Sequence, residues 1–447
     1  MPLQFARPDH PTMTTTLPRS RADRRRAAFR RKGGRAARMF VLLTVLIDAT
    51  GMGLIFPVMP NLLEELTGQN LAGAAVWGGI LGTAYSAMQF LFGPVVGNLS
   101  DAYGRRPVML TALFVMTMDY ILLAVAHTVT LILIGRIIGG IMAATHATAA
   151  AYMADISTPE EKGRNFGLIG AAFGVGFVLG PVIGSLASVI DLRAPFWIAG
   201  ALAAANLVFG WFVLPETVTR SIRRPFSWAR ANPLASFAAI GRLPGLRPLL
   251  AVFALFNLAG YVYPAVWSFF GKARFGWDPL HIGLSLAAFG IAMAFVQGVL
   301  VGPAIRRFGV WRTVILGFSL EIVAFLFYGV VANPVLALAF TPLAAIAGLG
   351  GPALQQIMSN IARDDQQGEL QGVLSSVAAI AMGISPLIMT AIFAFFTRES
   401  TPIYAPGMPF VAAAAMMVLA LAILWAYRPR GAVVPPAEAA GRPPGAA

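Results

Sequence analysis

The stretch Gly97-Asn-Leu-Ser-Asp-Ala-Tyr-Gly-Arg-Arg-Pro107 decides how the rest of the chain can fold. It is short, basic and rich in turn-forming residues, and it lies between two apolar segments that are each long enough to cross a bilayer. Its two glycines permit close approach and a positive φ, and Asp101 can cap a helix or face a helix dipole. Arg105 and Arg106 favour the cytoplasmic side of a membrane. The stretch therefore predicts a tight cytoplasmic connection between two membrane helices.

A weaker copy of this stretch begins 205 residues later, at Gly302. The same offset relates five pairs: Gly97 and Gly302, Tyr103 and Phe308, Gly104 and Gly309, Gly167 and Gly372, and Pro181 and Pro386. Coincidence in a glycine-rich chain is the alternative, but the two copies also occupy the same place in the order of apolar segments. The sequence therefore predicts two similar halves, each a bundle of membrane helices.

Composition indicates a membrane protein. Hydrophobic residues make up 57% of the chain, charged residues make up 12%, and mean hydropathy is +0.73. A soluble domain carries about twice as many charged residues. The net charge of +14 could indicate nucleic-acid binding, but eleven of the 33 lysines and arginines lie in residues 1–38 and most others lie in alternate loops. This is the positive-inside pattern, so we expect a lipid bilayer as partner and no nucleic acid.

Runs of about 20 apolar residues, separated by polar turns, predict twelve membrane-spanning helices. They lie near residues 39–60, 75–97, 107–126, 129–153, 166–188, 194–214, 246–270, 281–303, 312–332, 334–358, 370–396 and 405–427. An even number of spans returns the chain to one side. Together with the alternating basic loops, it predicts a multi-pass protein of the plasma (inner) membrane with both termini in the cytoplasm.

The predicted fold is an all-α membrane protein with twelve transmembrane helices in two pseudo-symmetric six-helix halves. Residues 39–214 form the first half and residues 246–427 the second, joined by a basic, proline-containing cytoplasmic loop at 215–245. Residues 428–447 form a cytoplasmic tail. We expect residues 1–38 to be a disordered basic tail. Two alternatives are that this segment binds anionic lipid and that the protein starts at Met39 or a nearby residue.

Four charged side chains fall inside the predicted spans: Asp48, Asp119, Glu321 and Arg136. Each costs about 2.5–3.5 kcal/mol at the bilayer centre and by default marks a transport pathway or a proton site. The alternatives are a charge that reaches the interface and, for Asp48 and Arg136, a structural ion pair. A carboxyl group in an apolar cavity can take up and release a proton under physiological conditions, as a proton-driven carrier requires.

Other polar side chains within the spans could line a path for a substrate. Tyr85 and Gln89 are four residues apart and share a helix face, and Asn257, Gln297 and Gln355 lie in the second half. The span at 246–270 also carries several aromatic residues: Phe253, Phe256, Tyr261, Tyr263 and Trp267. A cavity for a flat, partly apolar compound would use such aromatics with a few polar groups. For any single aromatic, lipid contact or core packing is the simpler explanation.

The span at 166–188 carries a series of three glycines with a proline between the second and the third. Gly176, Gly180 and Gly184 recur every four residues and form one smooth face for close helix packing. Pro181 removes a backbone hydrogen bond and can bend the helix. Plain packing and a hinge between two conformations are both consistent with this pattern.

These motifs resemble a known family. Gly97–Pro107 resembles the signature between helices 2 and 3 of the major facilitator superfamily, and the glycine series with Pro181 resembles a motif of its drug/proton antiporters. Further stretches resemble the tetracycline efflux branch: Asp48–Pro60, Tyr85 with Gln89, Asp119-Tyr120, Gly135-Arg136, Ala151–Asp155, Arg274–Trp277 and Gln367–Gly372. The resemblance extends from residue 39 to about residue 427.

The resemblance implies a twelve-helix antiporter that exports a drug in exchange for protons. Asp48, Asp119 and Glu321 would be its membrane carboxylates, Arg136 would be its span 4 arginine, and Asp101 would belong to a cytoplasmic gate. The chain differs from the branch in having Glu321 where Asp is common and Met293 where well-known members have a histidine in span 8.

We therefore predict a proton-coupled antiporter that exports a small drug-like molecule, tetracycline-like or another antibiotic, by alternating access and so confers antibiotic resistance. One alternative is a proton symporter that imports a sugar or metabolite, and another is a non-transporting membrane sensor or scaffold. We expect no enzymatic activity, because no nucleophile–base set occurs, and no metal site, because cysteine is absent and the four histidines are scattered. The expected partners are protons and a small-molecule substrate, without a cofactor, and we expect a monomer.

Overall fold

The computed structural model describes residues 21–143, 145–218, 223–228, 231–233, 239–243 and 245–427. Its helices are, in chain order, α1 (Arg21–Thr67), α2 (Leu71–Tyr103), α3 (Arg105–Val125), α4 (Val129–Met142), α5 (Thr145–Ile156), α6 (Pro159–Ser188), α7 (Ala194–Val213), η1 (Ala239–Arg242), α9 (Arg247–Gly260), α10 (Val262–Phe275), α11 (Pro279–Phe295), η2 (Val296–Leu300), α12 (Val301–Phe308), α13 (Val310–Val330), α14 (Pro334–Ala344), η3 (Ala345–Leu349), α15 (Gly350–Ile361), η4 (Asp364–Gln366), α16 (Gln367–Thr397) and α17 (Met408–Tyr427). No β-strand occurs among these residues.

Twelve segments of the described chain are long and apolar enough to cross a membrane, and each coincides with one predicted span. The prediction of twelve spans is therefore confirmed. Most helices run a few residues past the predicted limits, as α2 does through Asn98 to Tyr103, because the polar residues beyond an apolar run still keep helical geometry. Four spans consist of consecutive elements: α4–α5, α9–α10, α11–η2–α12 and α14–η3–α15.

The internal repeat is visible in two equivalent turns. Gly104, between α2 and α3, has φ of +118°, and Gly309, between α12 and α13, has φ of +77°. Each glycine amide donates to the carbonyl oxygen four residues earlier, of Ser100 at 3.1 Å and of Ile305 at 2.9 Å. The helices that follow, α3 and α13, each have 21 residues and begin 205 positions apart. The repeat predicted from sequence is confirmed at these turns, where a positive φ favours glycine.

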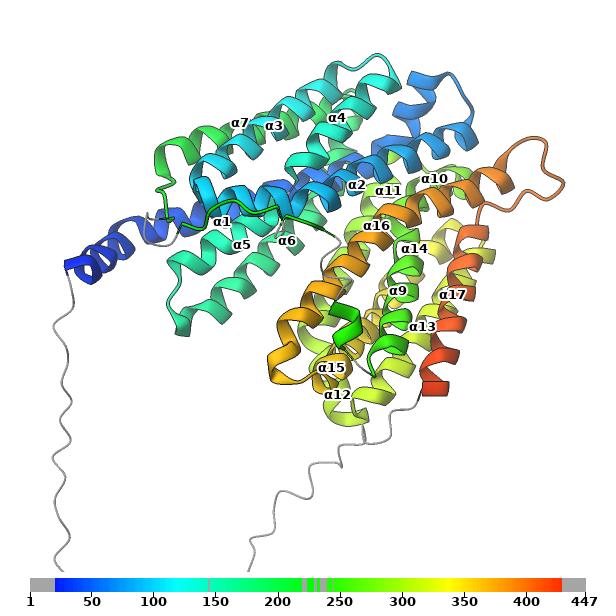
Figure 1. Cartoon of the computed structure of the whole chain (residues 1–447). Coiled ribbons are helices and arrows are strands. Elements are labelled where there is room, and N and C mark those ends of the chain that lie inside the picture. Colours follow the sequence, from blue (N-terminus) through cyan, green and yellow to red (C-terminus); the bar gives the residue numbers. More distant parts are fainter. Residues whose placement is uncertain are drawn as a thin grey trace, which may run out of the picture.

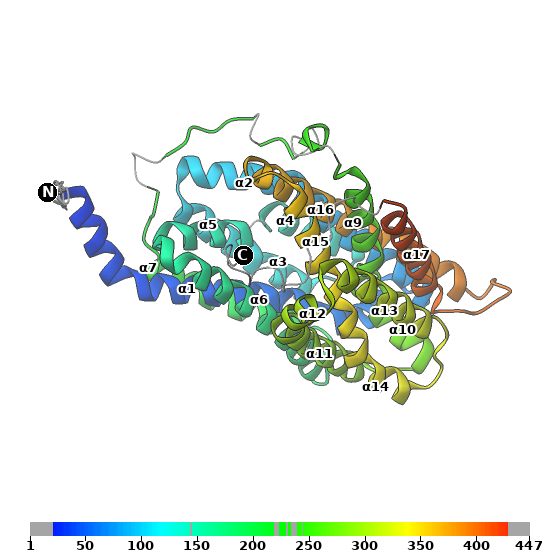
Figure 2. The ribbon, with the colours of Figure 1, turned by 90° about the horizontal axis from the view of Figure 1, so that it is seen from below.

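The helices form two groups, α1–α7 and α9–α17 (Figures 1 and 2). The groups touch where α2 packs on α16, α6 on α11, and α1 on α10. We call the end of the molecule that holds the turns at Gly104 and Gly309 the basic end, because both turns adjoin arginine pairs. The opposite end, which holds Gly68 and Gly276, is called the far end. The positive-inside pattern predicts that the basic end faces the cytoplasm.

Contacts between the two groups lie toward the far end. Thr83 Oγ1 donates to the carbonyl oxygen of Gly383 at 2.7 Å. A Cβ added at Gly79, near the start of α2, would lie 3.1 Å from the Pro386 carbonyl oxygen, whereas one at Gly97, near its end, would meet nothing within 4 Å. The groups therefore meet at the far end and diverge toward the basic end, as Figure 1 shows.

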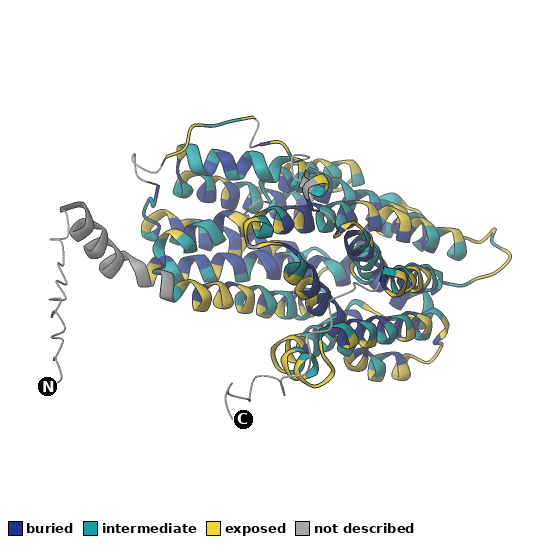
Figure 3. Cartoon of the chain, turned by 60° about the horizontal axis from the view of Figure 1, so that its bottom comes forward, coloured by how far each residue is buried: buried dark blue, intermediate teal, exposed yellow. Residues whose placement is uncertain are grey.

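The interior is apolar and continuous between the groups. The largest buried cluster includes Leu54 and Val58 of α1 together with Val266 and Phe269 of α10. Exposed residues gather on the outward faces of the helices (Figure 3). Large apolar side chains such as Phe212 are among them, as expected of a surface that faces lipid.

The N-terminal tail differs from expectation. Helix α1 begins at Arg21, inside the segment 1–38 that we expect to be disordered. This part of the sequence is rich in alanine and arginine, which are strong helix formers, so the helix extends ahead of the first span. Residues 1–20 and 428–447, the rest of the two predicted tails, lie outside the described residues, as does much of the loop at 215–245.

Candidate functional site

The first half holds a buried ion pair between Asp119 of α3 and Arg136 of α4. A Cβ added at Gly135 would lie 2.7 Å from Asp119 Oδ1, and one at Gly139 would lie 2.9 Å from Oδ2, so these two glycines leave the space that the carboxylate occupies. The guanidinium carbon of Arg136 lies 5.2 Å from the centre of the Tyr85 ring. This is the distance of a cation–π contact, which helps to hold the guanidinium group in place.

Asp48 of α1 is buried near this pair. Asp48, Asp119 and Arg136 all interact electrostatically with the hydroxyl groups of Tyr85 and Tyr120. Within the described residues Asp48 has no ion pair, so the structural pair with Arg136 that the sequence allows is not formed. Arg136 is instead paired with Asp119, and three of the four predicted intramembrane charges lie in one group of side chains.

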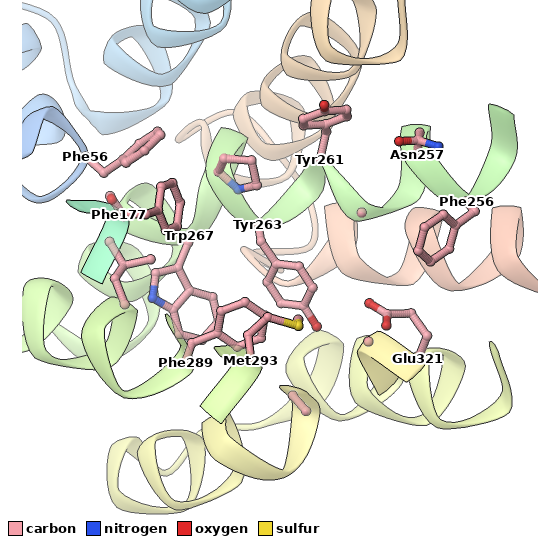
Figure 4. Close-up of a pocket in the computed structure, with 16 residues that line it drawn as sticks. Phe56, Phe177, Phe256, Asn257, Tyr261, Tyr263, Trp267, Phe289, Met293 and Glu321 are labelled. Atoms are coloured by element: carbon pink, nitrogen blue, oxygen red, sulfur yellow. The ribbon is translucent and has the colours of Figure 1, made fainter. Parts of the chain in front are cut away.

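The fourth intramembrane charge, Glu321, lies apart from them in the second half. It projects from α13 into the wall of a cavity of about 290 Å³ and is 9% exposed. The cavity lies mostly within the second half (Figure 4) and has an aromatic lining with few polar groups. Its walls are formed by Phe56, Phe177, Phe256, Asn257, Gly260, Tyr261, Tyr263, Pro264, Trp267, Ser268, Leu286, Phe289, Met293, Glu321, Ala344 and Gly348. No ion pair involves Glu321 in the described part of the chain.

Interrupted helices surround this cavity. α9 ends at Gly260 and α10 begins at Val262, and the Tyr261 amide donates to the Asn257 carbonyl oxygen at 3.0 Å across the break. The π-helical turn η2 begins three residues after Met293, and the 3₁₀ turn η3 contains Gly348. Non-helical backbone at membrane depth is tolerated where it is buried or lines a cavity, and π-turns are frequent at functional sites.

The predicted lining residues are distributed over several places. Asn257 lines the cavity, and its Nδ2 donates to the Phe253 carbonyl oxygen at 2.8 Å. Tyr85 packs against Arg136, and Gln89 Nε2 donates to the Ala143 carbonyl oxygen at 3.3 Å. Gln297 and Gln355 are exposed and lie outside the cavity wall. The roles assigned to these residues remain predictions.

The turn at Gly97–Pro107 carries a network of charges at the basic end. Arg105 Nη1 lies 2.7 Å from Asp101 Oδ1, and its Nε lies 3.4 Å from Asp155 Oδ2. Arg106 Nη2 donates to the Trp211 carbonyl oxygen at 2.8 Å. These bonds tie α2, α3, α5 and α7 together within the first half.

Glu216 completes this network and was not expected from the sequence. Its carboxylate accepts from the backbone amides of Arg105 at 2.9 Å and Arg106 at 3.2 Å, so it caps the start of α3. A Cβ added at Gly104 would also collide with this carboxylate. Glu216 follows the sixth span directly, but its sequence position alone does not indicate a partner 110 residues earlier.

The glycine series of α6 lies against the backbone of α1. A Cβ added at Gly180 would lie 2.5 Å from the Thr50 carbonyl oxygen and 2.8 Å from Gly53 Cα. Gly176 and Gly184 are equally close to the carbonyl oxygens one turn before and one turn after Thr50. Close packing of two helices is therefore observed, while a hinge at Pro181 remains a prediction.

A polar contact joins the halves at the far end. The Lys272 ammonium group of α10 pairs with the Glu64 carboxylate and donates to the Asn61 side chain, both on α1. A second far-end pair, Arg193 Nη1 with Glu65 Oε1 at 2.8 Å, lies within the first half.

The comparison with known proteins agrees with this architecture. A family model described as Major Facilitator Superfamily matches residues 41–273 and 249–446. The chain belongs to the major facilitator superfamily. It is accordingly a multi-pass membrane transporter for a small-molecule substrate, and the resemblance stated from its motifs is confirmed.

Within this superfamily the chain is similar to several resistance proteins. It is 40% identical to "Tetracycline resistance protein, class C" of Escherichia coli, over 80% of this chain and 90% of that protein. It is 37% identical to the class G protein of Vibrio anguillarum, over 80% and 91%. The crystal structure of the human organic anion transporter MFSD10 (TETRAN) has a TM-score of 0.64 and 27% identity, covering 87% of this chain and 99% of that one. The D-xylose-proton symporter has a TM-score of 0.70 at 16% identity, which shows a shared fold.

Proposed function

We propose that this major facilitator exports a drug-like molecule, tetracycline or another antibiotic, in exchange for protons. The observation that carries the proposal is Glu321, a buried carboxyl group without an ion-pair partner among the described residues, in the wall of an aromatic cavity. Such a group is costly at membrane depth unless it binds something there. A proton and a substrate are the two candidates, and an antiporter binds them alternately.

The similarity to resistance proteins supports the choice of substrate. Six tetracycline resistance proteins of different classes share 33–40% identity with the chain over most of its length. An aromatic cavity with few polar groups suits a flat, mostly apolar compound better than a sugar, whose hydroxyl groups would lose their hydrogen bonds to water there. The alternatives of an importer and a non-transporting sensor gain no comparable support.

The two halves differ in how their charges are compensated. Asp119 is neutralised by Arg136, while Glu321 has no cation beside it in the described chain. Glu321 is therefore the better candidate for proton uptake and release, with Asp119 and Asp48 affecting it through the conformation of the first half. Each proton that enters down a potential of 100 mV supplies about 2.3 kcal/mol. Alternating access would use this energy to open the far-end contacts and to close the basic end.

Everted membrane vesicles test the proposal. Wild-type vesicles should accumulate tetracycline when energised, and an uncoupler should abolish the accumulation. Glu321→Gln, which keeps the shape but cannot ionise, should lose net transport. Asp365→Asn, which removes an exposed carboxylate paired with Arg363 at 2.7 Å, is the matched control and should transport normally. Accumulation that is insensitive to the uncoupler, or that persists in Glu321→Gln, would contradict proton coupling at this residue.

A further inference from the structure

The cavity has two chemically different ends (Figure 4). The Glu321 carboxylate, the Tyr263 hydroxyl and the Asn257 side chain lie toward one end, all in the second half. Phe56 and Phe177, both from the first half, lie at the other. We propose that the cavity binds a flat amphipathic substrate in one orientation, with its hydrogen-bonding edge against Glu321 and Tyr263 and its apolar rings against Phe56 and Phe177. This inference rests on the proposed transport function and specifies how the substrate lies in the cavity.

Tyr263 is the residue that defines the polar end. Its hydroxyl oxygen is buried and has no hydrogen-bond partner within the described residues. The hydroxyl and the Glu321 carboxylate point toward one another from α10 and α13 (Figure 4). A buried hydroxyl without a partner is destabilising, so a substrate that supplies the partner gains affinity from it.

Packing holds the Tyr263 ring in this position. The ring centre lies 5.6 Å from that of Phe289, 5.4 Å from Phe325 and 5.7 Å from Phe410. Tyr263 also lies two residues beyond the break between α9 and α10, so the backbone there is fixed by the ends of two helices. The hydroxyl therefore cannot turn away to find another partner without moving the surrounding rings, and it is already in position before the substrate arrives.

The apolar end is built from the other half. The Phe56 ring of α1 and the Phe177 ring of α6 meet edge to face with centres 6.4 Å apart. They offer no hydrogen-bonding group, so polar substituents at this end would lose their contacts with water. A substrate that spans both ends touches both halves at once, which is how its binding would favour one arrangement of the halves over another.

This arrangement specifies a chemical class. Because Glu321 accepts hydrogen bonds when ionised and Tyr263 can donate or accept one, the recognised edge carries a hydrogen-bond donor next to a second polar group. The remainder is flat and apolar, because it lies on aromatic faces. A compound with hydroxyl groups on all sides does not fit a cavity with one polar and one apolar end, because the hydroxyl groups at the apolar end would lack hydrogen-bond partners.

Tyr263→Phe tests the orientation, because phenylalanine keeps the aromatic packing and removes only the hydroxyl. The matched control is Tyr328→Phe, whose hydroxyl lies 3.2 Å from Thr341 Oγ1 and whose ring lies in the same aromatic cluster, 6.2 Å from that of Tyr263. Uptake of tetracycline into energised everted vesicles is measured as KM and maximal rate. Tyr263→Phe should raise KM about three- to tenfold with the maximal rate within about twofold, as expected for one lost hydrogen bond, and the control should leave KM within about twofold.

A second variant examines the other end. Phe177→Tyr adds a hydroxyl to the apolar wall with little change in size and should also raise KM. Wild-type uptake together with an unchanged KM in Tyr263→Phe and Phe177→Tyr would overturn the orientation while leaving the transport function intact. No tetracycline uptake by the wild-type chain would overturn tetracycline as the substrate and, with it, the orientation proposed for it.

Discussion

Replacing Lys272 by Met should shift the molecule toward an arrangement that is open at the far end. Lys272 forms the one ion pair between the two halves in the described chain, with Glu64, and also bonds Asn61. Methionine keeps most of the apolar stem but cannot make either contact. The contacts formed by Thr83 and by the apolar cluster should keep the protein folded.

The magnitude follows from the exposure of the pair. The Lys272 and Glu64 side chains are 29% and 28% exposed, so solvent screens their attraction and about 1 kcal/mol is a reasonable contribution. The hydrogen bond to Asn61 adds about 1 kcal/mol, less than a buried bond to a charged group, because the lysine is partly exposed to solvent. A loss of about 1–2 kcal/mol changes the ratio of the two populations by roughly 5- to 30-fold.

Distances between spin labels measure this shift. The chain has no cysteine, so Gln69→Cys in the first half and Ser400→Cys in the second can be labelled without background. Both positions are exposed at the far end. When Lys272→Met is added to this doubly labelled protein, pulsed electron paramagnetic resonance should show a larger fraction of long distances between the two labels than without it.

Arg193→Met is the matched control, because it breaks the pair with Glu65 at the same end but within one half. Its distance distribution should equal that of the wild type. An unchanged distribution in Lys272→Met, or an equal shift in both variants, would refute the view that the Lys272 contact holds the halves together.

Two further predictions concern stability and are measured by thermal unfolding in detergent. Gly104→Ala and Gly309→Ala both place alanine at positive φ, but only Gly104→Ala also collides with the Glu216 carboxylate. Gly104→Ala should therefore lower the free energy of unfolding by about 1–3 kcal/mol more than Gly309→Ala does. Equal losses would show that the Glu216 side chain moves aside. Asp278 caps α11, and the backbone amide of His281, which donates to it at 2.9 Å, lowers the pKa of its carboxyl group. Because the folded pKa is the lower one, the stabilisation is present above about pH 4 and is lost as the pH falls through the folded pKa. The loss of stability in Asp278→Ala should therefore shrink when the pH is lowered from 7 to 3, and a loss that is independent of pH would contradict a role for the charge.

The spans and the equivalent turns could be predicted because their signals are local. A run of about 20 apolar residues is sufficient to predict a helix that crosses a bilayer. A glycine close to an arginine pair, between two apolar runs, indicates a turn, and repetition of that pattern at one offset indicates two halves. These features hardly depend on which helices become neighbours, and the structure agrees with them at Gly104 and Gly309.

Contacts that depend on neighbouring helices could not be predicted in the same way. Glu216 caps a helix that begins 111 residues earlier, and Phe56 and Phe177 reach a cavity formed mainly by the other half. The sequence suggested Asp48 as an ion-pair partner of Arg136, whereas the packing of α3 on α4 pairs Arg136 with Asp119. The breaks within the seventh, eighth and tenth spans carry weak signals, because each is a few residues of altered hydrogen bonding inside an apolar run.

Helix α6 packs against one helix of each half, α1 and α11. One face lies on the backbone of α1 through Gly180 and its neighbours, and another touches α11 of the second half, where a Cβ added at Gly290 would lie 2.7 Å from a Val178 methyl carbon. Since no side chain separates α6 from α1 at the glycines, there is nothing compressible between them to absorb a displacement. A tilt imposed at the α6–α11 boundary would therefore move the α1 backbone directly, including the residues on either side of Asp48.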